Sequence, residues 1–367
     1  MRIRSITTLL CSGALLAGMS LTTSCNSGGS GSGSDTTNKS SDDNTLLGAG
    51  STFVYPLFSK MFAEYNTQTQ LKVNYQSIGS GGGILQLTNK TVDFGDSDAP
   101  LNDEQATKIG VPVLHIPMCS GAVAISYNLP DLKDTLKLTP VVLTQIFAGD
   151  IKTWNDKAIA AVNPGVKLPN LPIVVAHRSD GSGTTNIFTT YLMKVDSADW
   201  GKIGKGSAVN WPGSTIGGKG TEGVAGTIKQ TPGAIGYIEL AYAVQNKMAF
   251  AKLQNKSGNY ITPSVASTTA AGNVTIPADS KVSLSNTEAA DGYPISGFTW
   301  AIIYKEQNYN GRSLDRATKL VKLLWWNIHD GQKFAEPLTY APLPANAVTV
   351  AEAILKSATY DGKPILQ

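Results

Sequence analysis

The stretch AHRSDGSGTTNIF, residues 176–188, joins a strand pattern to a helix pattern through a turn of small residues. Ile173–Ala176 predict the strand, and NIFTTYLMKV, residues 186–195, predicts the helix. A strand, a glycine-rich turn and a helix in this order are typical of α/β domains with a parallel sheet. The turn also holds Arg178 and Asp180, so the predicted fold places a charged pair at the start of a helix.

The same alternation continues along the chain after residue 44. Strand patterns occur at Leu71–Ile78, Val113–Ile116, Ala122–Tyr127, Ile173–Ala176, Ile235–Ile238 and Thr299–Tyr304. Helix patterns occur in TFVYPLFSKMFAEYN (52–66), which places Phe53, Leu57, Met61 and Tyr65 on one face beside Phe58 and Phe62, in ATKLVKLLWWNIH (317–329) and in VAEAILKSA (350–358). Since 367 residues exceed what one hydrophobic core usually serves, we expect two α/β domains.

Three glycine-rich turns open predicted helices. They are GAGSTF (48–53), GSGGG (79–83) and DGSGTT (180–185). The first turn of a helix leaves backbone N–H groups without partners at the positive end of the helix dipole, and glycine allows close approach, so an anion is favoured there. Each turn alone is explained equally well as a simple helix cap. Three such turns, one of them with Arg178, favour an anion-binding site.

The N-terminus has the pattern of an export signal. Residues 1–24 form a short basic start followed by an apolar stretch and small residues, which predicts a signal peptide. Cys25 follows in a context that resembles a bacterial lipobox, although Thr22 occupies the preferred apolar position. Residues 25–44 are rich in Gly, Ser and Asp and predict a flexible tether. We expect an exported, periplasmic protein anchored by a lipid on Cys25; the alternative is a secreted protein without an anchor.

Charge and cysteine usage exclude several classes of site. The net charge is +3, and without Arg2 and Arg4 of the signal 28 basic residues face 27 acidic ones, so no basic footprint for nucleic acid is predicted. Only Cys119 remains besides Cys11 and Cys25, so we expect an inert core thiol and no internal disulfide. The three histidines show no metal-ligand spacing, and no metal or cofactor is predicted.

Catalytic motifs remain incomplete in this chain. Ser182 lacks the G-x-S-x-G spacing of a nucleophile elbow. GSTIGGKGT (213–221) is similar to a phosphate-binding loop up to Lys219, but Gly220 stands where Ser or Thr must hold magnesium, and no predicted strand precedes it. The acidic stretch VDFGDSDAP (92–100) fits a strand end and turn as well as a metal site. A secreted phosphatase-like enzyme that uses Ser182 stays open as the alternative from another class.

Eight stretches taken together resemble one known family. They are GAGSTFVYPLF (48–58), VNYQSIGSGGGI (73–84), VDFGDSDAPL (92–101), IKTWND (151–156), DGSGTT (180–185), WPGSTIGGKGTEGVAG (211–226), PGAIGYIELAYA (232–243) and YPISGFTW (293–300). In this order they resemble the PstS family, the periplasmic phosphate-binding component of the bacterial phosphate ABC transporter. The resemblance implies a monomeric receptor that binds inorganic phosphate and delivers it to a membrane permease without performing chemistry.

The resemblance also implies a two-lobe periplasmic binding protein (Venus-flytrap) fold of type II. Two hinge strands join the α/β lobes, which close over the ligand. The first lobe is expected to be discontinuous, from residues 45–120 and 294–367, and the second lobe to span residues 121–293.

The phosphate ligands implied by the resemblance lie on the three glycine-rich turns and on one aspartate. They are Thr52, Phe53, Ser80, Asp98, Arg178, Ser182, Gly183 and Thr184. Asp180 is expected to pair with the Arg178 guanidinium and to fix the orientation of its planar donor fork. Ser51 stands where alanine is common in the family, and His177 where a second basic residue can occur; neither change removes an implied ligand.

Asp98 gives the implied site its specificity. An ionised carboxylate only accepts hydrogen bonds, so it needs a ligand that still carries a proton. Phosphate keeps at least one proton near neutral pH, whereas sulfate keeps none and would place a like charge against Asp98. Receptors for sulfate, molybdate or tungstate share the lobed architecture and are the alternative within this fold.

Overall fold

The computed structural model describes residues 43–366 with the exception of Ser214. The predicted signal peptide, the predicted lipidation site Cys25 and the tether up to residue 42 lie outside the described residues. Those described belong to one compact unit with a mixed sheet at its centre.

The central sheet has the strand order β2-β1-β3-β12-β4-β8-β6-β7, with β9 beside β4. The strands are β1 (Thr45–Gly50), β2 (Lys72–Ser77), β3 (Phe94–Ser97), β4 (Val113–Tyr127), β6 (Val174–Arg178), β7 (Thr215–Gly218), β8 (Ala234–Glu239), β9 (Ala249–Phe250) and β12 (Ser296–Tyr304). A small sheet contains β5 (Lys137–Leu138), β10 (Lys252–Gln254) and β11 (Tyr260–Ile261), and a hairpin contains β13 (Thr359–Tyr360) and β14 (Lys363–Pro364). The strands β1, β2 and β3 are parallel to one another, as are β6, β7 and β8, which is the α/β pattern predicted from the sequence.

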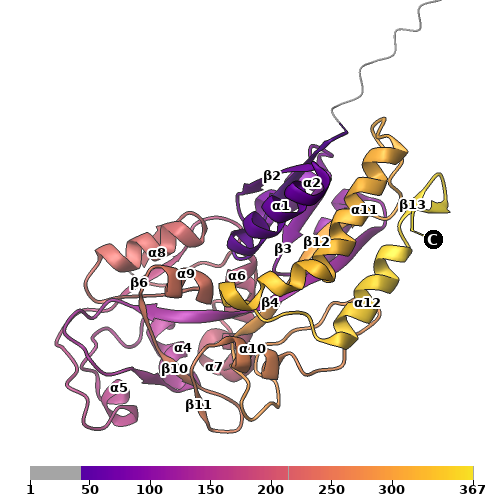
Figure 1. Ribbon diagram of the computed structural model, residues 1–367. Coiled ribbons are helices and arrows are strands. Elements are labelled where there is room, and N and C mark those ends of the chain that lie inside the picture. The colour runs from indigo at the N-terminus through magenta and orange to yellow at the C-terminus, as the bar shows by residue number, and fades with distance from the viewer. Residues whose placement is uncertain (1–42, 214, 367) are drawn as a thin grey trace, which may run out of the picture. The chain divides into compact units, whose positions relative to one another are not determined.

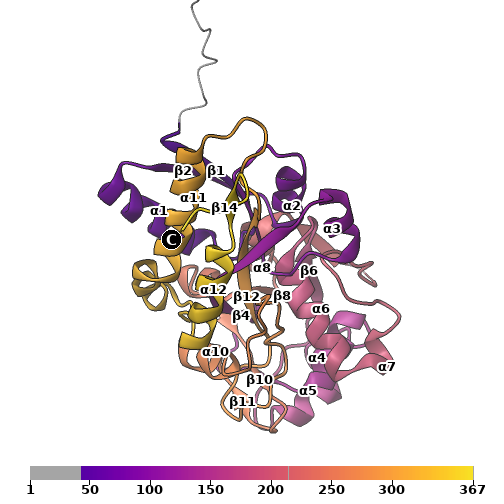
Figure 2. The same cartoon turned by 90° about the vertical axis from the view of Figure 1, so that its right-hand side faces the viewer.

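The long strands β4 and β12 connect the two parallel groups. The first part of β4 pairs antiparallel with β12, and its last residues, Val123–Tyr127, pair with β8. The strand β12 in turn pairs with β3, and it lies beside β4 in both views (Figure 1 and Figure 2). The sheet therefore has the arrangement of a two-lobe fold with two shared strands, while the predicted lobe boundaries remain a prediction.

The prediction of two separate strands, Val113–Ile116 and Ala122–Tyr127, is wrong because β4 is continuous. Pro117, which cannot donate a hydrogen bond to a neighbouring strand, lies between the two predicted strands. In the structure Trp300 pairs with Pro117 but Thr299 pairs with Cys119, so the register shifts at this point. Such a bulge tolerates proline inside a strand. The register shift lies next to Thr299, which contacts the site described below.

The helices lie along both groups of strands (Figure 1). They are α1 (Tyr55–Thr69), α2 (Ser80–Thr88), α3 (Asp103–Ile109), α4 (Pro140–Ala148), α5 (Lys157–Val162), α6 (Gly183–Val195), α7 (Ser197–Trp200), α8 (Gly220–Gln230), α9 (Leu240–Gln245), α10 (Val265–Ala271), α11 (Leu314–Ile328) and α12 (Ala345–Lys356), with the short 3-10 helices η1 (Asp330–Phe334) and η2 (Glu336–Leu338). None of the helices in the described part of the chain has the length and apolar character needed to cross a membrane.

The predicted apolar face of the first helix is confirmed. Its members Phe53, Leu57, Met61 and Tyr65 are buried, as are Phe58 and Phe62 beside them. The helix begins at Tyr55 rather than at residue 52, with Pro56 in its first turn, where a missing N–H has no consequence. Residues 51–54 are therefore left outside the helix, as the turn that leads from β1 into the site.

The segment GSTIGGKGT, for which no preceding strand was predicted, itself contains β7 and leads into α8. The strand is short and ends in Gly217 and Gly218, so its sequence has no apolar run to reveal it. As predicted, no strand precedes this segment in residues 201–212; the strand that leads into α8 lies inside the segment itself. As a consequence α8 begins at the same end of the sheet as α6 does.

Candidate anion-binding site

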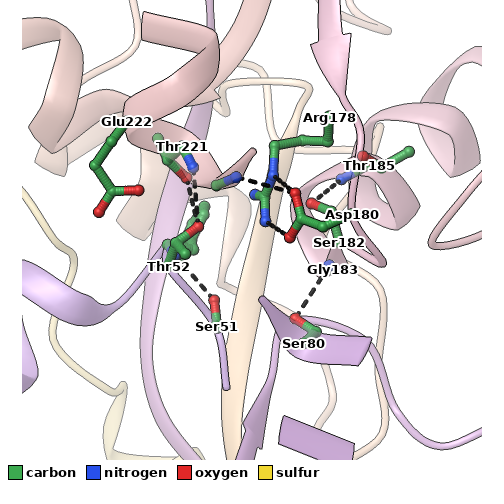
Figure 3. Close-up of polar contacts among 12 residues, drawn as sticks. Ser51, Thr52, Ser80, Arg178, Asp180, Ser182, Gly183, Thr185, Thr221 and Glu222 are labelled. Atoms are coloured by element: carbon green, nitrogen blue, oxygen red, sulfur yellow. Dashed lines mark hydrogen bonds and ion pairs between the residues drawn. The ribbon is translucent and has the colours of Figure 1, made fainter. Parts of the chain in front are cut away.

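Turns from both parallel groups of strands meet at one place in the fold (Figure 3). Ser51 and Thr52 follow β1, Ser80 begins α2, and the segment from Arg178 to Thr184 joins β6 to α6. The start of α8, at Gly220 and Thr221, completes the set. Parallel strands end at the same edge of a sheet, which is why turns distant in sequence come together here.

The turn after β1 contacts the start of α8. The hydroxyl of Thr52 lies 2.9 Å from the hydroxyl of Thr221 and accepts a 3.1 Å hydrogen bond from the Thr221 N–H. The Tyr242 hydroxyl lies 2.9 Å from the carbonyl oxygen of Thr52 and 2.9 Å from Oε1 of Glu222. The contacts of Thr52 with Thr221 and Tyr242 join residues that are about half the chain apart in sequence, between the first and the second predicted lobe.

The start of α2 contacts the start of α6. The Ser80 hydroxyl oxygen accepts a 3.1 Å hydrogen bond from the Gly183 N–H, and the Gly81 N–H donates to the carbonyl of Gly181 at 2.9 Å. Gly79 has a φ of 85°, and a Cβ atom there would lie 2.2 Å from Oδ2 of Asp180. Only glycine fits this left-handed, crowded position, so the GSGGG turn allows the two helix starts to approach each other.

Arg178 and Asp180 form the predicted pair. Nε and Nη2 of Arg178 donate to the two carboxylate oxygens of Asp180 at 2.8 and 2.5 Å. The Gly220 N–H donates to Oδ1 of the same carboxylate at 3.0 Å. Burial by itself would raise the pKa of Asp180, but the hydrogen bonds and the charge of Arg178 hold it below its ordinary value. The aspartate is thus an ionised support for a buried guanidinium, and Nη1 takes no part in the pair.

The first turn of α6 contributes two hydroxyls. Ser182 is the N-cap residue, and its oxygen accepts a 3.1 Å hydrogen bond from the Thr185 N–H. The hydroxyl oxygen of Thr184 is buried and has no hydrogen-bond partner within the described residues. Thr184 also lowers the pKa of Asp98, so its hydroxyl lies close to that carboxylate.

Asp98 lies at the end of β3, and only 3% of its surface is exposed. Its Oδ1 accepts hydrogen bonds from the Ser51 hydroxyl at 2.6 Å and the Thr299 hydroxyl at 2.8 Å. Its Oδ2 is directed towards the start of α6, since a Cβ atom added to Gly183 would lie 2.7 Å from it. Burial raises the pKa of Asp98 to about 6, against the lowering effect of the Ser51 and Thr299 hydroxyls, of Arg178 and of the Thr184 hydroxyl.

The predicted ligand residues are brought together, with one exception in orientation. The side chains of Thr52, Ser80, Asp98, Arg178, Ser182 and Thr184 are all buried at the meeting turns, and the Gly183 N–H is beside them. Phe53 places its N–H against Ser51, to whose hydroxyl oxygen it donates at 3.0 Å, and its ring is buried in the core. The ligand role of each residue remains a prediction, which their common location supports.

Four residues at the site were missed by the sequence reasoning. Ser51 and Thr299 hold Asp98, and Thr221 and Tyr242 contact Thr52. Ser51 was noticed only as a departure from alanine. Thr221 was hidden in the segment rejected as an incomplete phosphate-binding loop, and no sequence signal pointed to Thr299 or Tyr242.

Cys119 and the possible metal ligands are the other polar groups considered in the sequence. Cys119 is buried in β4 without a disulfide partner, and burial raises the pKa of its thiol well above the ordinary value, as fits a core thiol. Within residues 43–366, Ser214 apart, no cluster of His, Cys, Asp and Glu could hold a metal ion.

Comparison with known proteins agrees with this geometry. The model of the PBP superfamily domain matches residues 33–323. The chain is 44% identical over 315 residues to the phosphate-binding protein PstS of Xylella fastidiosa (strain Temecula1), with 84% of each chain covered. The chain belongs to the PstS family. The PstS of Pasteurella multocida is 41% identical over 332 residues, which cover 88% of this chain and 94% of the relative.

Solved structures show that the fold is that of a periplasmic phosphate-binding protein. The structure of PfluDING, a high-affinity periplasmic phosphate-binding protein with bound phosphate, superposes with a TM-score of 0.70 at 22% identity. The superposition covers 84% of this chain and 93% of PfluDING. The PstS family and this fold agree with the two-lobe architecture implied by the sequence resemblance.

Proposed function

We propose that this protein binds inorganic phosphate where the turns of its two groups of strands meet, and delivers it to the membrane permease of an ABC-type phosphate transporter. The observation that carries the proposal is Asp98, a buried carboxylate whose described hydrogen bonds come from hydroxyls rather than from a cation. Such a carboxylate beside Arg178 and several helix N-termini favours an anion that still carries a proton.

Each implied ligand has a chemical task in this proposal. Arg178 supplies charge, while Thr52, Ser80, Ser182 and Thr184 supply hydroxyls. The N–H groups of Phe53 and Gly183 are implied donors as well, and in this structure they donate to the hydroxyl oxygens of Ser51 and Ser80. Each charge-assisted hydrogen bond contributes about 1.5 to 3 kcal/mol net. Asp98 accepts the hydrogen bond from the phosphate proton. Because sulfate has no such proton, the same carboxylate argues against receptors for sulfate, molybdate or tungstate.

Binding is coupled to closure of the two predicted lobes, residues 45–120 with 294–367 and residues 121–293. The contact of Thr52 with Thr221 and that of Ser80 with Gly183 both cross from one predicted lobe to the other. A ligand that bridges these turns interacts more strongly with the closed conformation and therefore increases its population. We expect the permease to recognise the closed conformation.

The remaining parts of the proposal concern where the protein acts. We infer that residues 1–24 direct export, that Cys25 carries a lipid anchor and that the receptor works as a monomer. The protein is expected to bind phosphate without turning over a phosphate ester, since no nucleophile and base were found together in the sequence.

The decisive experiment is a calorimetric titration of the phosphate-stripped protein with phosphate and, separately, with sulfate. We expect one-to-one phosphate binding and no heat from sulfate. Arg178→Ala should weaken phosphate binding at least tenfold, because one charge-assisted hydrogen bond is worth about that factor. The exposed Lys202→Ala removes a charge elsewhere on the surface and serves as the matched control.

Three outcomes would change the proposal. Equal affinity for sulfate would contradict the specificity assigned to Asp98. An unchanged phosphate affinity in Arg178→Ala would remove this residue from the site. Turnover of a chromogenic phosphate ester that disappears in Ser182→Ala would favour the phosphatase-like alternative instead.

A further inference from the structure

A second buried carboxylate lies next to the one that faces the ligand. Asp96 is inside β3, two residues before Asp98, and its side chain is fully buried. The hydroxyl of Thr299 lies between the two acids, 2.8 Å from Oδ1 of Asp96 and 2.8 Å from Oδ1 of Asp98. Oδ2 of Asp96 is buried without a hydrogen-bond partner in the described part of the chain.

The Thr299 hydroxyl between Asp96 and Asp98 has too few hydrogen atoms to form a hydrogen bond with both acids if both are ionised. A threonine hydroxyl has one hydrogen, so it can donate to only one of the two carboxylates. With both acids ionised, the other 2.8 Å contact would place two oxygen lone pairs against each other. One additional proton, on one of the two acids, turns both contacts into hydrogen bonds.

The partners of the two acids show which one carries this proton. Oδ1 of Asp98 also accepts a 2.6 Å hydrogen bond from the Ser51 hydroxyl. The Ser51 oxygen itself accepts from the Phe53 N–H at 3.0 Å, so the hydrogen of Ser51 is available for Asp98. Asp98 thus has two hydroxyl donors, which stabilise a carboxylate, whereas Asp96 has Thr299 alone. The proton belongs on Asp96.

The charges around the pair support this assignment. The groups that act on the two acids from neighbouring elements are Arg178 of β6, Glu239 of β8, Tyr75 of β2 and Cys119 of β4, and Lys281 lines the same cavity as Asp98. Arg178 acts on Asp98 and holds its pKa down, while burial and the charge of Asp98 raise the pKa of Asp96 well above its ordinary value. Glu239 is itself buried, and burial raises its pKa well above the ordinary value.

We propose that Asp96 is a protonated positioning residue: it donates to Thr299, Thr299 and Ser51 donate to Oδ1 of Asp98, and Asp98 turns Oδ2 to the ligand. This inference rests on the proposed phosphate site. Ser51, in which the chain departs from the alanine common in its family, is a specificity-determining residue in this scheme, together with Thr299. Their loss would let Asp98 take up a proton near neutral pH, and a protonated Asp98 can donate to sulfate.

Infrared difference spectroscopy tests the proton on Asp96 directly, in the full-length protein without ligand. A protonated carboxyl group has a C=O stretching band that a carboxylate lacks. Buried Glu239 also has a raised pKa and contributes a band of this kind, so Glu239→Gln identifies its share. We expect the remaining band, that of Asp96, at neutral pH in the wild type and in Asp98→Asn, and its loss in Asp96→Asn. An unchanged spectrum in a folded Asp96→Asn variant would overturn the proposal. If that variant does not fold, NMR titration of the wild type with isotope-labelled aspartate replaces it, and Asp96 must then stay protonated at neutral pH.

Binding measurements test the hydroxyls. Thr299→Val removes the hydroxyl at nearly constant shape, and Thr299→Ser keeps it as the matched control. We expect Thr299→Val and Ser51→Ala to bind phosphate about tenfold more weakly near neutral pH and to gain measurable sulfate binding. When the pH is lowered, both variants should lose phosphate binding at a higher pH than the wild type does. Thr299→Ser should behave like the wild type. Equal pH profiles and equal sulfate exclusion in Thr299→Val and Thr299→Ser would contradict the scheme.

The two proposals fail in distinguishable ways. If the wild type bound no phosphate, the proposed function would be wrong, while the infrared band would still decide the protonation of Asp96. If the wild type bound phosphate but lacked the band, only the present inference would be lost.

Discussion

Two aspartates at the opposite ends of β3 are equally buried but have different partners. Asp93 stands before the strand and Asp98 after it, and each is 3% exposed. Asp93 receives a bidentate interaction from Arg316 at 2.8 and 2.6 Å, a further hydrogen bond from Arg312 and a 2.6 Å hydrogen bond from the Leu47 N–H. Asp98 accepts hydrogen bonds from the hydroxyls of Ser51 and Thr299.

The difference separates a structural carboxylate from a binding one. The two guanidinium groups compensate the charge of Asp93 and connect β3 to α11, more than 200 residues later in the chain. The hydroxyls around Asp98 stabilise its charge only in part, and its second oxygen is directed towards the start of α6. A buried acid that is paired within the protein holds the fold, whereas one that is left with an acceptor to satisfy is prepared for a ligand.

The largest effect is expected from breaking the structural pair. Asp93→Asn removes the buried carboxylate that both Arg312 and Arg316 contact, which should lower the free energy of unfolding by about 3 to 5 kcal/mol. Phosphate affinity should change less than about twofold, since the pair is remote from the implied ligands. Urea denaturation and calorimetric titration of the same preparation measure both values. A stable variant with impaired binding would reverse the roles of the two aspartates.

The corresponding substitution, Asp98→Asn, should change the free energy of unfolding in a way that depends on pH, because Asp98 contributes stability only while it is protonated. The pKa of Asp98 is raised to about 6 in the folded protein, so its contribution to stability is complete below about pH 4 and is lost as pH rises towards about 6. The free energy of unfolding of the wild type, minus that of Asp98→Asn, should therefore decrease by up to about 3 kcal/mol as the pH rises over this range. This value corresponds to a shift of roughly two pKa units.

Thermal or urea unfolding without phosphate, at acidic and at neutral pH, gives this difference. The same Asp98→Asn protein should bind phosphate at least tenfold more weakly, because the acceptor for the phosphate proton is gone. A difference in stability that does not depend on pH would show that Asp98 has an ordinary pKa and would weaken the comparison with Asp93.

The smallest effects should distinguish the two arginines of the structural pair. Arg316→Lys replaces a bidentate fork with a point charge and should lose about 1.5 to 3 kcal/mol of stability. Arg312 contacts Asp93 through Nη1 alone, and its Nε and Nη2 have no hydrogen-bond partners in the described residues, so Arg312→Lys should lose about 1 kcal/mol or less. Equal losses would mean that charge alone, rather than geometry, holds Asp93.

The sequence predicted those features of the fold that depend on residues close together in the chain. The alternation of patterns predicted the α/β class, and three glycine-rich turns with small polar residues predicted helix starts suited to an anion. The resemblance to the PstS family then supplied a set of ligand residues, which the fold brings together. The pairing of Asp180 with Arg178, which the resemblance implied, is present in the structure.

The parts that could not be predicted depend on contacts between distant residues. No local pattern assigns Asp93 to Arg312 and Arg316, or Asp98 to Thr299, since these pairs are about 200 or more residues apart. Ser51 was seen as a tolerated departure because sequence alone cannot show which side chain its hydroxyl contacts. The bulge that makes β4 continuous through Pro117 likewise depends on the partner strand β12.

The position of β12 between β3 and β4 also determines the order in which the sheet can be completed. Strands β1 to β4 are synthesised within the first 127 residues, yet β3 and β4 have to wait for residues 296–304 before their facing edges are paired. Pairing over such a separation is slow, and unpaired edges meanwhile invite intermolecular contacts. A chain terminated before residue 296 would keep both edges open, so we expect the pairing of residues 296–304 with β3 and β4 to be the step that ends the period of aggregation risk.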